Sequence, residues 1–121
     1  MRLGRVIGRV TLSEDDPAFH GARWLLVSPL TRAQLREGPP YAISTAATLV
    51  VYDGLGAGID EIVGYVEGAE ATQPFAVPTP VDALVVCLVD RLNYQPPAQT
   101  ATVTPAISKP PDTRVAVAPL K

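Results

Sequence analysis

Residues 48–68 read TLVVYDGLGAGIDEIVGYVEG, two apolar runs separated by a glycine-rich segment. The runs TLVVYD and IVGYVEG are rich in Val, Ile and Tyr, the residue types that favour β-strands. A short connection containing Gly between two such runs is typical of a β-hairpin. We therefore expect residues 53–63 to form a tight loop between two strands of an all-β fold.

The flanking segments predict three more strands and little helix. Residues 3–12 alternate loosely between apolar and polar positions, with glycines that suggest a bend or a close approach. ARWLLVSPL (22–30) and ALVVCLVDRL (83–92) are further strands, and the second is expected to be almost wholly buried. TRAQLRE (31–37) predicts one or two helical turns, with Thr31 as the N-cap. Five short strands with only short helical segments predict a small five-stranded OB-like barrel or a sandwich.

Composition divides the chain into two parts. Residues 1–94 are predicted to form the barrel domain, and residues 95–121 a C-terminal extension in which six of 27 residues are proline. Within the extension, TRVAVAPL (113–120) alternates briefly and predicts a strand added to a neighbouring sheet edge. The same composition fits a solvated tail equally well.

Charge and cysteine content exclude several function classes. Residues 41–90 hold seven acidic residues and no Lys or Arg, which argues against nucleic-acid binding because such binding depends on cations that contact phosphates. The single Cys87 sits in an apolar run and is expected to be a buried thiol, without a disulfide or zinc site. His20 has no second ligand nearby, so no metal and no cofactor is expected. The N-terminus MRLGRVIGRV does not resemble a signal peptide, and we expect a cytoplasmic protein that does not insert into membranes.

The glycine segment permits a phosphate-binding interpretation and a catalytic one, and both are weak. Gly54, Gly56 and Gly58 are spaced G-x-G-x-G and lead into a strand, whereas a dinucleotide fingerprint requires G-x-G-x-x-G opening a helix. An aspartic-protease half-site built on Asp53 lacks the hydroxyl residue that usually follows the aspartate and needs a second copy of the chain. A non-catalytic alternative is an OB-like binding module for single-stranded nucleic acid or an oligosaccharide. Its stacking residues are then the aromatic side chains Trp24, Tyr41, Tyr52 and Tyr65.

Four ordered motifs resemble the EutN/CcmL family of bacterial microcompartment vertex proteins. The motifs are GRVIGRV (4–10), ARWLLVSPL (22–30), VVYDGLGAGIDEIV (50–63) and TPVDALVVCLVDRL (79–92), so the resemblance covers about residues 1–92. The chain departs from the family pattern in a longer segment 31–48, in the absence of the usual basic residue from GAEAT (68–72), and in the proline-rich extension.

The resemblance implies a structural shell protein without enzyme activity. Its barrel is expected to assemble into a homopentamer that caps the five-fold vertices of the shell, beside hexameric or trimeric facet proteins. Glycines in the loop then allow close approach of neighbouring chains, and acidic loop residues pair with arginines of the next subunit. The expected interface residues are Asp53, Gly54, Gly56, Ala57, Gly58, Asp60 and Glu61 in the loop, with Arg5, Arg9 and Arg23 as their partners.

Overall fold

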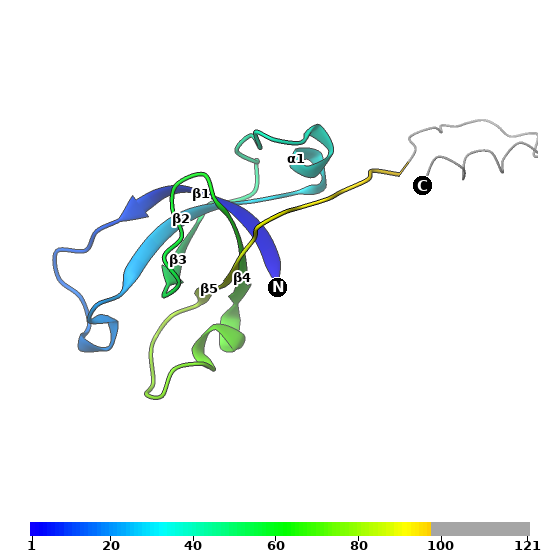
Figure 1. Ribbon diagram of the computed structural model, residues 1–121. Coiled ribbons are helices and arrows are strands. Elements are labelled where there is room, and N and C mark those ends of the chain that lie inside the picture. The colour runs from blue at the N-terminus through cyan, green and yellow to red at the C-terminus, as the bar shows by residue number, and fades with distance from the viewer. Residues whose placement is uncertain (98–121) are drawn as a thin grey trace, which may run out of the picture.

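The computed structural model describes residues 1–97, so most of the predicted extension, including TRVAVAPL (113–120), lies outside the described residues. The described part is an all-β barrel with short helical turns, which confirms the predicted fold class (Figure 1). Its strands are β1 (Arg2–Val10), β2 (Arg23–Pro29), β3 (Leu49–Asp53), β4 (Ile62–Glu67) and β5 (Ala83–Leu88). The helical elements are η1 (Pro17–Phe19), α1 (Arg32–Glu37) and η2 (Gly68–Thr72). None of the helices within residues 1–97 is long and apolar enough to span a membrane.

The strands close into a barrel in the order β1-β2-β3-β5-β4. All neighbours are antiparallel except β3 and β5, which run parallel. The predicted hairpin between β3 and β4 is therefore wrong, because β5 lies between these two strands. The reason lies at the end of the connecting loop, where Asp60 N–H donates to the Val6 carbonyl (2.8 Å) and Val6 N–H donates to the Glu61 carbonyl (2.9 Å). These bonds align the start of β4 with β1 instead of β3.

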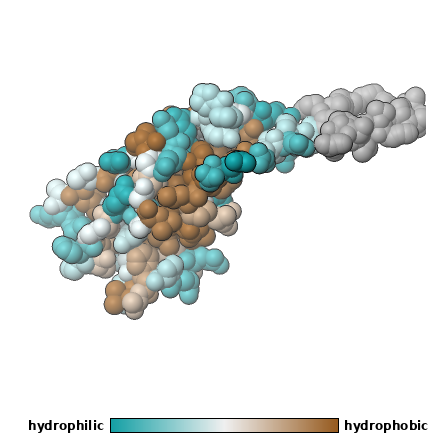
Figure 2. Space-filling model, viewed as in Figure 1, coloured by the Kyte–Doolittle hydropathy of each residue, from teal (hydrophilic) through white to brown (hydrophobic). Residues whose placement is uncertain are grey.

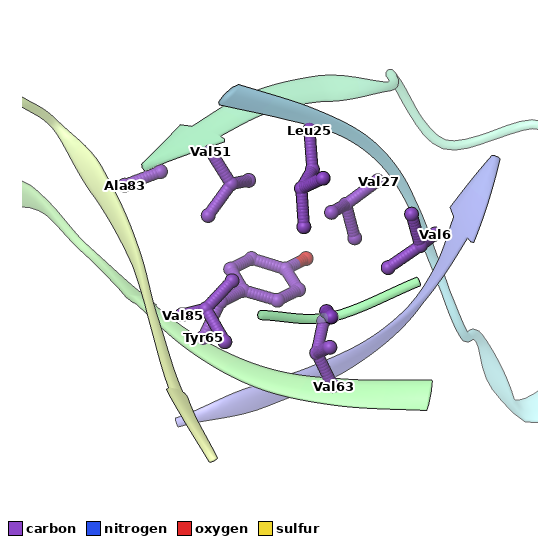
Figure 3. Close-up of a cluster of buried hydrophobic side chains, with 9 residues drawn as sticks. Val6, Leu25, Val27, Val51, Val63, Tyr65, Ala83 and Val85 are labelled. Atoms are coloured by element: carbon purple, nitrogen blue, oxygen red, sulfur yellow. The ribbon is translucent and has the colours of Figure 1, made fainter. Parts of the chain in front are cut away.

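The barrel interior is filled by one aromatic ring and a shell of aliphatic side chains (Figure 3). Tyr65 lies in the middle of this cluster and is fully buried. Gly4 leaves the space that the ring needs, because a Cβ built on Gly4 would lie 3.1 Å from the Tyr65 ring and would clash with the Val27 side chain. The close approach predicted for this strand is thus confirmed at Gly4. The shell around the ring consists of Val6, Leu25, Val27, Val51, Ala57, Val63, Ala83 and Val85.

A second cluster covers part of the outer surface of the barrel. Phe19, Trp24, Tyr52 and Phe75 form a chain of three edge-to-face aromatic pairs, with ring centroids 4.8 to 5.3 Å apart. Leu84 of β5 packs in this cluster together with Ala71 and Val81. The aromatic chain ties η1 and the segment after η2 to the outer faces of β2 and β3.

The second half of β5 departs from the prediction of an almost wholly buried strand. Val86 is 39% exposed and Leu88 is 42% exposed, because the outer cluster covers β5 only as far as Leu84. Cys87 is half-buried, so the expectation of a buried thiol is also wrong. Its sulfur lies 3.7 Å from the sulfur of Met1.

Helix α1 begins where the sequence predicts. Thr31 is its N-cap, and the Thr31 N–H donates to the side-chain oxygen of Gln34 at 3.2 Å, one half of a capping box. The helix ends at Gly38, whose φ of 78° is accessible mainly to glycine.

Candidate functional site

The loop between β3 and β4 is organised by the side chain of Asp53. Its Oδ1 accepts hydrogen bonds from the N–H groups of Leu55 (2.8 Å) and Gly56 (3.2 Å). Its Oδ2 accepts from Gly56 (3.2 Å) and Ala57 (2.8 Å). The carboxylate is fully buried, and three consecutive backbone amides surround it. Aspartate favours turns because its side chain can bond backbone amides a few residues ahead in this way.

Arg23 of β2 completes the environment of Asp53. Its Nη1 lies 3.3 Å from Asp53 Oδ2, and its Nη2 donates to the Ala57 carbonyl at 3.1 Å. Register explains the contact, because Arg23 lies opposite Asp53 in the β2–β3 ladder. One guanidinium therefore neutralises the buried carboxylate and also bonds the backbone of the loop.

The tight path of the loop depends on Gly56 and Ala57. Gly56 has a φ of 92°, a conformation in which an L side chain is strained. The turn at Gly56 directs the Ala57 methyl group into the barrel, where it is fully buried in the core cluster. Ala57 thus anchors the loop to the barrel core.

Side chains at the protein surface hold the second half of the loop. The Gly58 N–H donates to Glu61 Oε1 at 2.7 Å, and Arg5 of β1 contacts Asp60 Oδ1 through Nη2 at 2.7 Å. Asp60 has a φ of 75°, which aspartate tolerates better than most residues. Arg5 also donates to the Tyr41 carbonyl, so it links the loop to the segment after α1.

The structure places most of the predicted site residues together. Asp53, Gly56 and Ala57 form one unit with Arg23, while Gly58, Asp60 and Glu61 form a second with Arg5. Both ion pairs join residues of a single chain. Gly54 is exposed at the start of the loop. Arg9 forms no salt bridge within residues 1–97; with Arg23, Asp15 and Trp24 it lines a surface hollow of about 270 Å³.

Sequence reasoning missed that Asp53 binds the loop's own backbone. The available signal was an aspartate at the end of a strand, followed immediately by small and glycine residues whose amides can turn toward it. The bonding to Arg23 had no local signal, because the two residues are thirty positions apart and meet only through strand register.

This geometry argues against both the phosphate-binding and the aspartic-protease interpretation of the loop. Three successive amides make a concave anion site, but here the Asp53 carboxylate fills it, so it does not present these N–H groups to a phosphate. The same carboxylate is buried and accepts several hydrogen bonds, which leaves it poorly placed to act as a general base. No group of His, Cys, Asp and Glu suited to a metal ion occurs among residues 1–97.

Three of the four aromatic residues named for an OB-like nucleic-acid module, Trp24, Tyr52 and Tyr65, pack against other side chains of the barrel. Tyr65 is inside the barrel, and burial there raises the pKa of its phenol above the usual value near 10. Trp24 and Tyr52 pack edge-to-face within the outer cluster. Flat faces on which successive bases stack are the main feature of such modules.

Comparison with known proteins identifies relatives over the barrel. Residues 1–90 match the family described as "Ethanolamine utilisation protein EutN/carboxysome". The carboxysome shell vertex protein CcmL of Gloeobacter violaceus is 33% identical over 94 residues, which cover 77% of this chain and 86% of CcmL. The shell vertex protein PduN of Salmonella typhimurium is 34% identical over 94 residues, covering 77% of this chain and 99% of PduN.

Solved structures agree with the sequence matches. The GrpN pentameric microcompartment shell protein from Rhodospirillum rubrum superimposes with a TM-score of 0.63 at 34% identity, covering 78% of this chain and all of that chain. Gloeobacter violaceus CcmL superimposes with the same score and identity, covering 78% of this chain and 90% of that chain. The family match spans the whole barrel, including the β3–β4 loop, and the chain therefore belongs to the EutN/CcmL family.

Proposed function

We propose that this protein forms homopentamers that occupy the five-fold vertices of a bacterial microcompartment shell, and that it has no catalytic activity. The observation that carries the proposal is the match of residues 1–90 to a family whose relatives are named as shell vertex proteins. GrpN, a pentamer, has the same barrel at 34% identity. The proposed location is the shell itself, within the cytoplasm.

The loop has the properties that a protein–protein contact needs. Asp53, Arg23 and Ala57 hold the backbone in one conformation before any partner arrives, so little conformational entropy remains to be lost on binding. Ile59 projects from this rigid loop and is 48% exposed. Apolar side chains on a preformed loop can be buried against a neighbouring subunit with a net gain.

We place the β3–β4 loop at the subunit boundary, with Arg9 as a cation for the next subunit. A cyclic pentamer is built from two different patches, one on each side of the subunit. Arg5 and Arg23 each pair within their own chain, whereas Arg9 has no salt bridge within residues 1–97 and is exposed. In the proposed contact, Arg9 pairs with Asp60 or Glu61 of the neighbouring chain.

The proposed partners beyond the pentamer are the hexameric or trimeric facet proteins of the same shell. A surface tiled with hexagonal units closes into a polyhedron only where five-fold units interrupt the tiling, and a pentamer of small barrels supplies such a unit. Mixed assembly of this protein with facet proteins would test this step, with closed particles expected only when the pentamer is present.

The oligomeric state tests the proposal directly. Light scattering and native mass spectrometry at micromolar concentration are expected to give a mass five times that of one chain. A dominant monomer or dimer would overturn the pentamer. Retention of single-stranded DNA that weakens steeply with salt would instead favour the nucleic-acid alternative.

Gly58→Leu tests the position of the loop. A Cβ at Gly58 meets only the Glu61 carboxyl group, at 3.9 Å, so the barrel should fold with the larger side chain. At a crowded subunit boundary, the variant is expected to lose pentamers and accumulate folded monomers. Ala47→Leu, on an exposed position outside the loop, is the control and is expected to remain pentameric. Intact pentamers of Gly58→Leu would place the loop away from the boundary.

A further inference from the structure

An apolar groove of about 320 Å³ lies on the outer surface where β3 ends beside β5. Leu55 and Val86, both partly exposed, line it. In the view of Figure 2, hydrophobic side chains gather in the middle of the molecule, over the region where β4 and β5 lie in Figure 1. The lining also includes the aromatic or apolar side chains of Tyr52, Pro74, Phe75, Leu84 and Val85.

The groove adjoins a strand edge that is only partly paired. β4 pairs with β5 from Ala83 to Leu88, with a shift in register that leaves Val86 without a partner in β4. β3 pairs with β5 at one position only, Tyr52 opposite Leu84, because β3 ends at Asp53. Beyond that position, no strand within residues 1–97 pairs with the β3 side of β5. An unpaired edge of this kind is a template for an added strand.

This half of the barrel and the end of the chain carry net charges of opposite sign. Residues 41–90, which include β3, β4 and β5, hold seven acidic residues and no basic one. Residues 98–121 hold three basic residues, Lys109, Arg114 and Lys121, and one acidic residue, Asp112. The two parts of the chain are therefore complementary in charge, which favours their encounter.

We propose that residues 113–120, TRVAVAPL, bind in this groove as an extended strand added to the edge of β5. In an extended strand, Val115 and Val117 point to one side and Ala116 and Ala118 to the other. The two valines enter the groove beside Leu55 and Val86, while backbone hydrogen bonds form with the open edge. Pro119 ends the added strand because it has no N–H to donate.

The chain is long enough for this contact. Residues 98–112 connect the described part to the binding segment, and fifteen extended residues reach about 50 Å. That length exceeds the dimensions of a barrel of this size. The covalent tether also raises the effective concentration of the segment at the groove, which allows a short strand to bind.

Hydrogen exchange in the full-length chain tests the proposal. The amides of 86–88 are followed by mass spectrometry in the natural chain, in Val115→Asp/Val117→Asp, and in the matched control Ala116→Asp/Ala118→Asp. Both variants add two carboxylates to the segment, but only the first places them on the side that enters the groove. We expect exchange at 86–88 to be about tenfold faster in the valine variant and close to natural in the alanine variant.

Other outcomes overturn the proposal. Protection that persists in both variants means that something else, such as a neighbouring subunit, covers the groove. Fast exchange in the natural chain means that the groove is open, and equal loss in both variants means that general charge attraction acts without a strand register. Light scattering on each variant keeps a failure of pentamer assembly distinct from a failure of the segment to bind.

Discussion

Two Asp–Arg pairs hold the β3–β4 loop, and the pair with the shorter distance is the more exposed of the two. Asp60 and Arg5 are closer, at 2.7 Å, but the Asp60 side chain is 69% exposed. Asp53 and Arg23 are 3.3 Å apart, and the Asp53 side chain is fully buried. Asp53 also accepts hydrogen bonds from three backbone amides, whereas Asp60 accepts from Arg5 alone among the described side-chain contacts.

Distance alone is therefore a poor measure of what an ion pair contributes to stability. The charges of an exposed pair lose part of their hydration, and solvent screens the attraction between them. Such a pair contributes roughly 0 to 1 kcal/mol to stability. A buried carboxylate that loses its charge leaves several donors without an acceptor, and each such bond to a charged group is worth about 1.5–3 kcal/mol. The conformation of the loop should therefore depend more on the Asp53–Arg23 pair than on the Asp60–Arg5 pair.

Asp53→Asn should produce the largest effect. The asparagine keeps the shape but replaces one acceptor oxygen by a donor group that faces the Ala57 or Leu55 N–H. We expect the free energy of unfolding to fall by about 3 kcal/mol, measured by chemical denaturation. Arg23→Lys should show a smaller loss, because lysine cannot contact the carboxylate and the Ala57 carbonyl with a planar fork. A loss below about 1 kcal/mol for Asp53→Asn would show that water replaces the carboxylate in the loop.

Gly56→Ala tests the backbone that the buried pair stabilises. Alanine at a φ of 92° should lower the free energy of unfolding by about 1–2 kcal/mol. The new methyl group would lie 3.5 Å from Arg23 Nη1. Gly54→Ala is the matched control, since a Cβ there meets only the Tyr52 ring at 3.9 Å. Thermal denaturation of both variants gives the comparison, and equal midpoints would mean that the loop rearranges without strain.

Tyr65→Phe extends the comparison to a buried polar group without a partner. The Tyr65 hydroxyl has no hydrogen-bond partner within residues 1–97, so its removal should raise the free energy of unfolding by about 1 kcal/mol. Burial raises the pKa of this phenol in the folded chain. The unfolded chain therefore loses the proton first, and stability should be constant below pH of about 10 and fall above it. Denaturation curves between neutral and alkaline pH should show a smaller alkaline loss in the phenylalanine variant; an identical loss would assign the effect to other groups.

Asp60→Asn should produce the smallest effect. Asparagine tolerates the positive φ at this position, so the substitution removes the charge and keeps the backbone. We expect a loss of about 0.5 kcal/mol at low salt that vanishes as salt is added. A loss as large as that of Asp53→Asn would contradict the ranking of the two pairs by burial.

Local sequence was sufficient to predict the strands, because their apolar and β-branched residues form compact runs between Gly, Pro and Asp. It also predicted the start of α1 at Thr31 and the close approach at Gly4. The family followed from four ordered motifs, and the match over residues 1–90 confirms it. Each of these predictions was made from the pattern within short stretches of sequence.

Pairing between distant residues was decided only by the tertiary structure. The predicted β3–β4 hairpin failed because the hydrogen bonds of Val6 align β4 with β1, and β5 then enters between β3 and β4. The exposure of Val86 and Leu88 likewise depends on where the outer cluster ends, which an apolar run does not reveal. Asp53 stands between the two cases: its position before small and glycine residues was a local signal for a turn that went unused, and only the barrel register supplied Arg23 as the cation that allows its carboxylate to be buried.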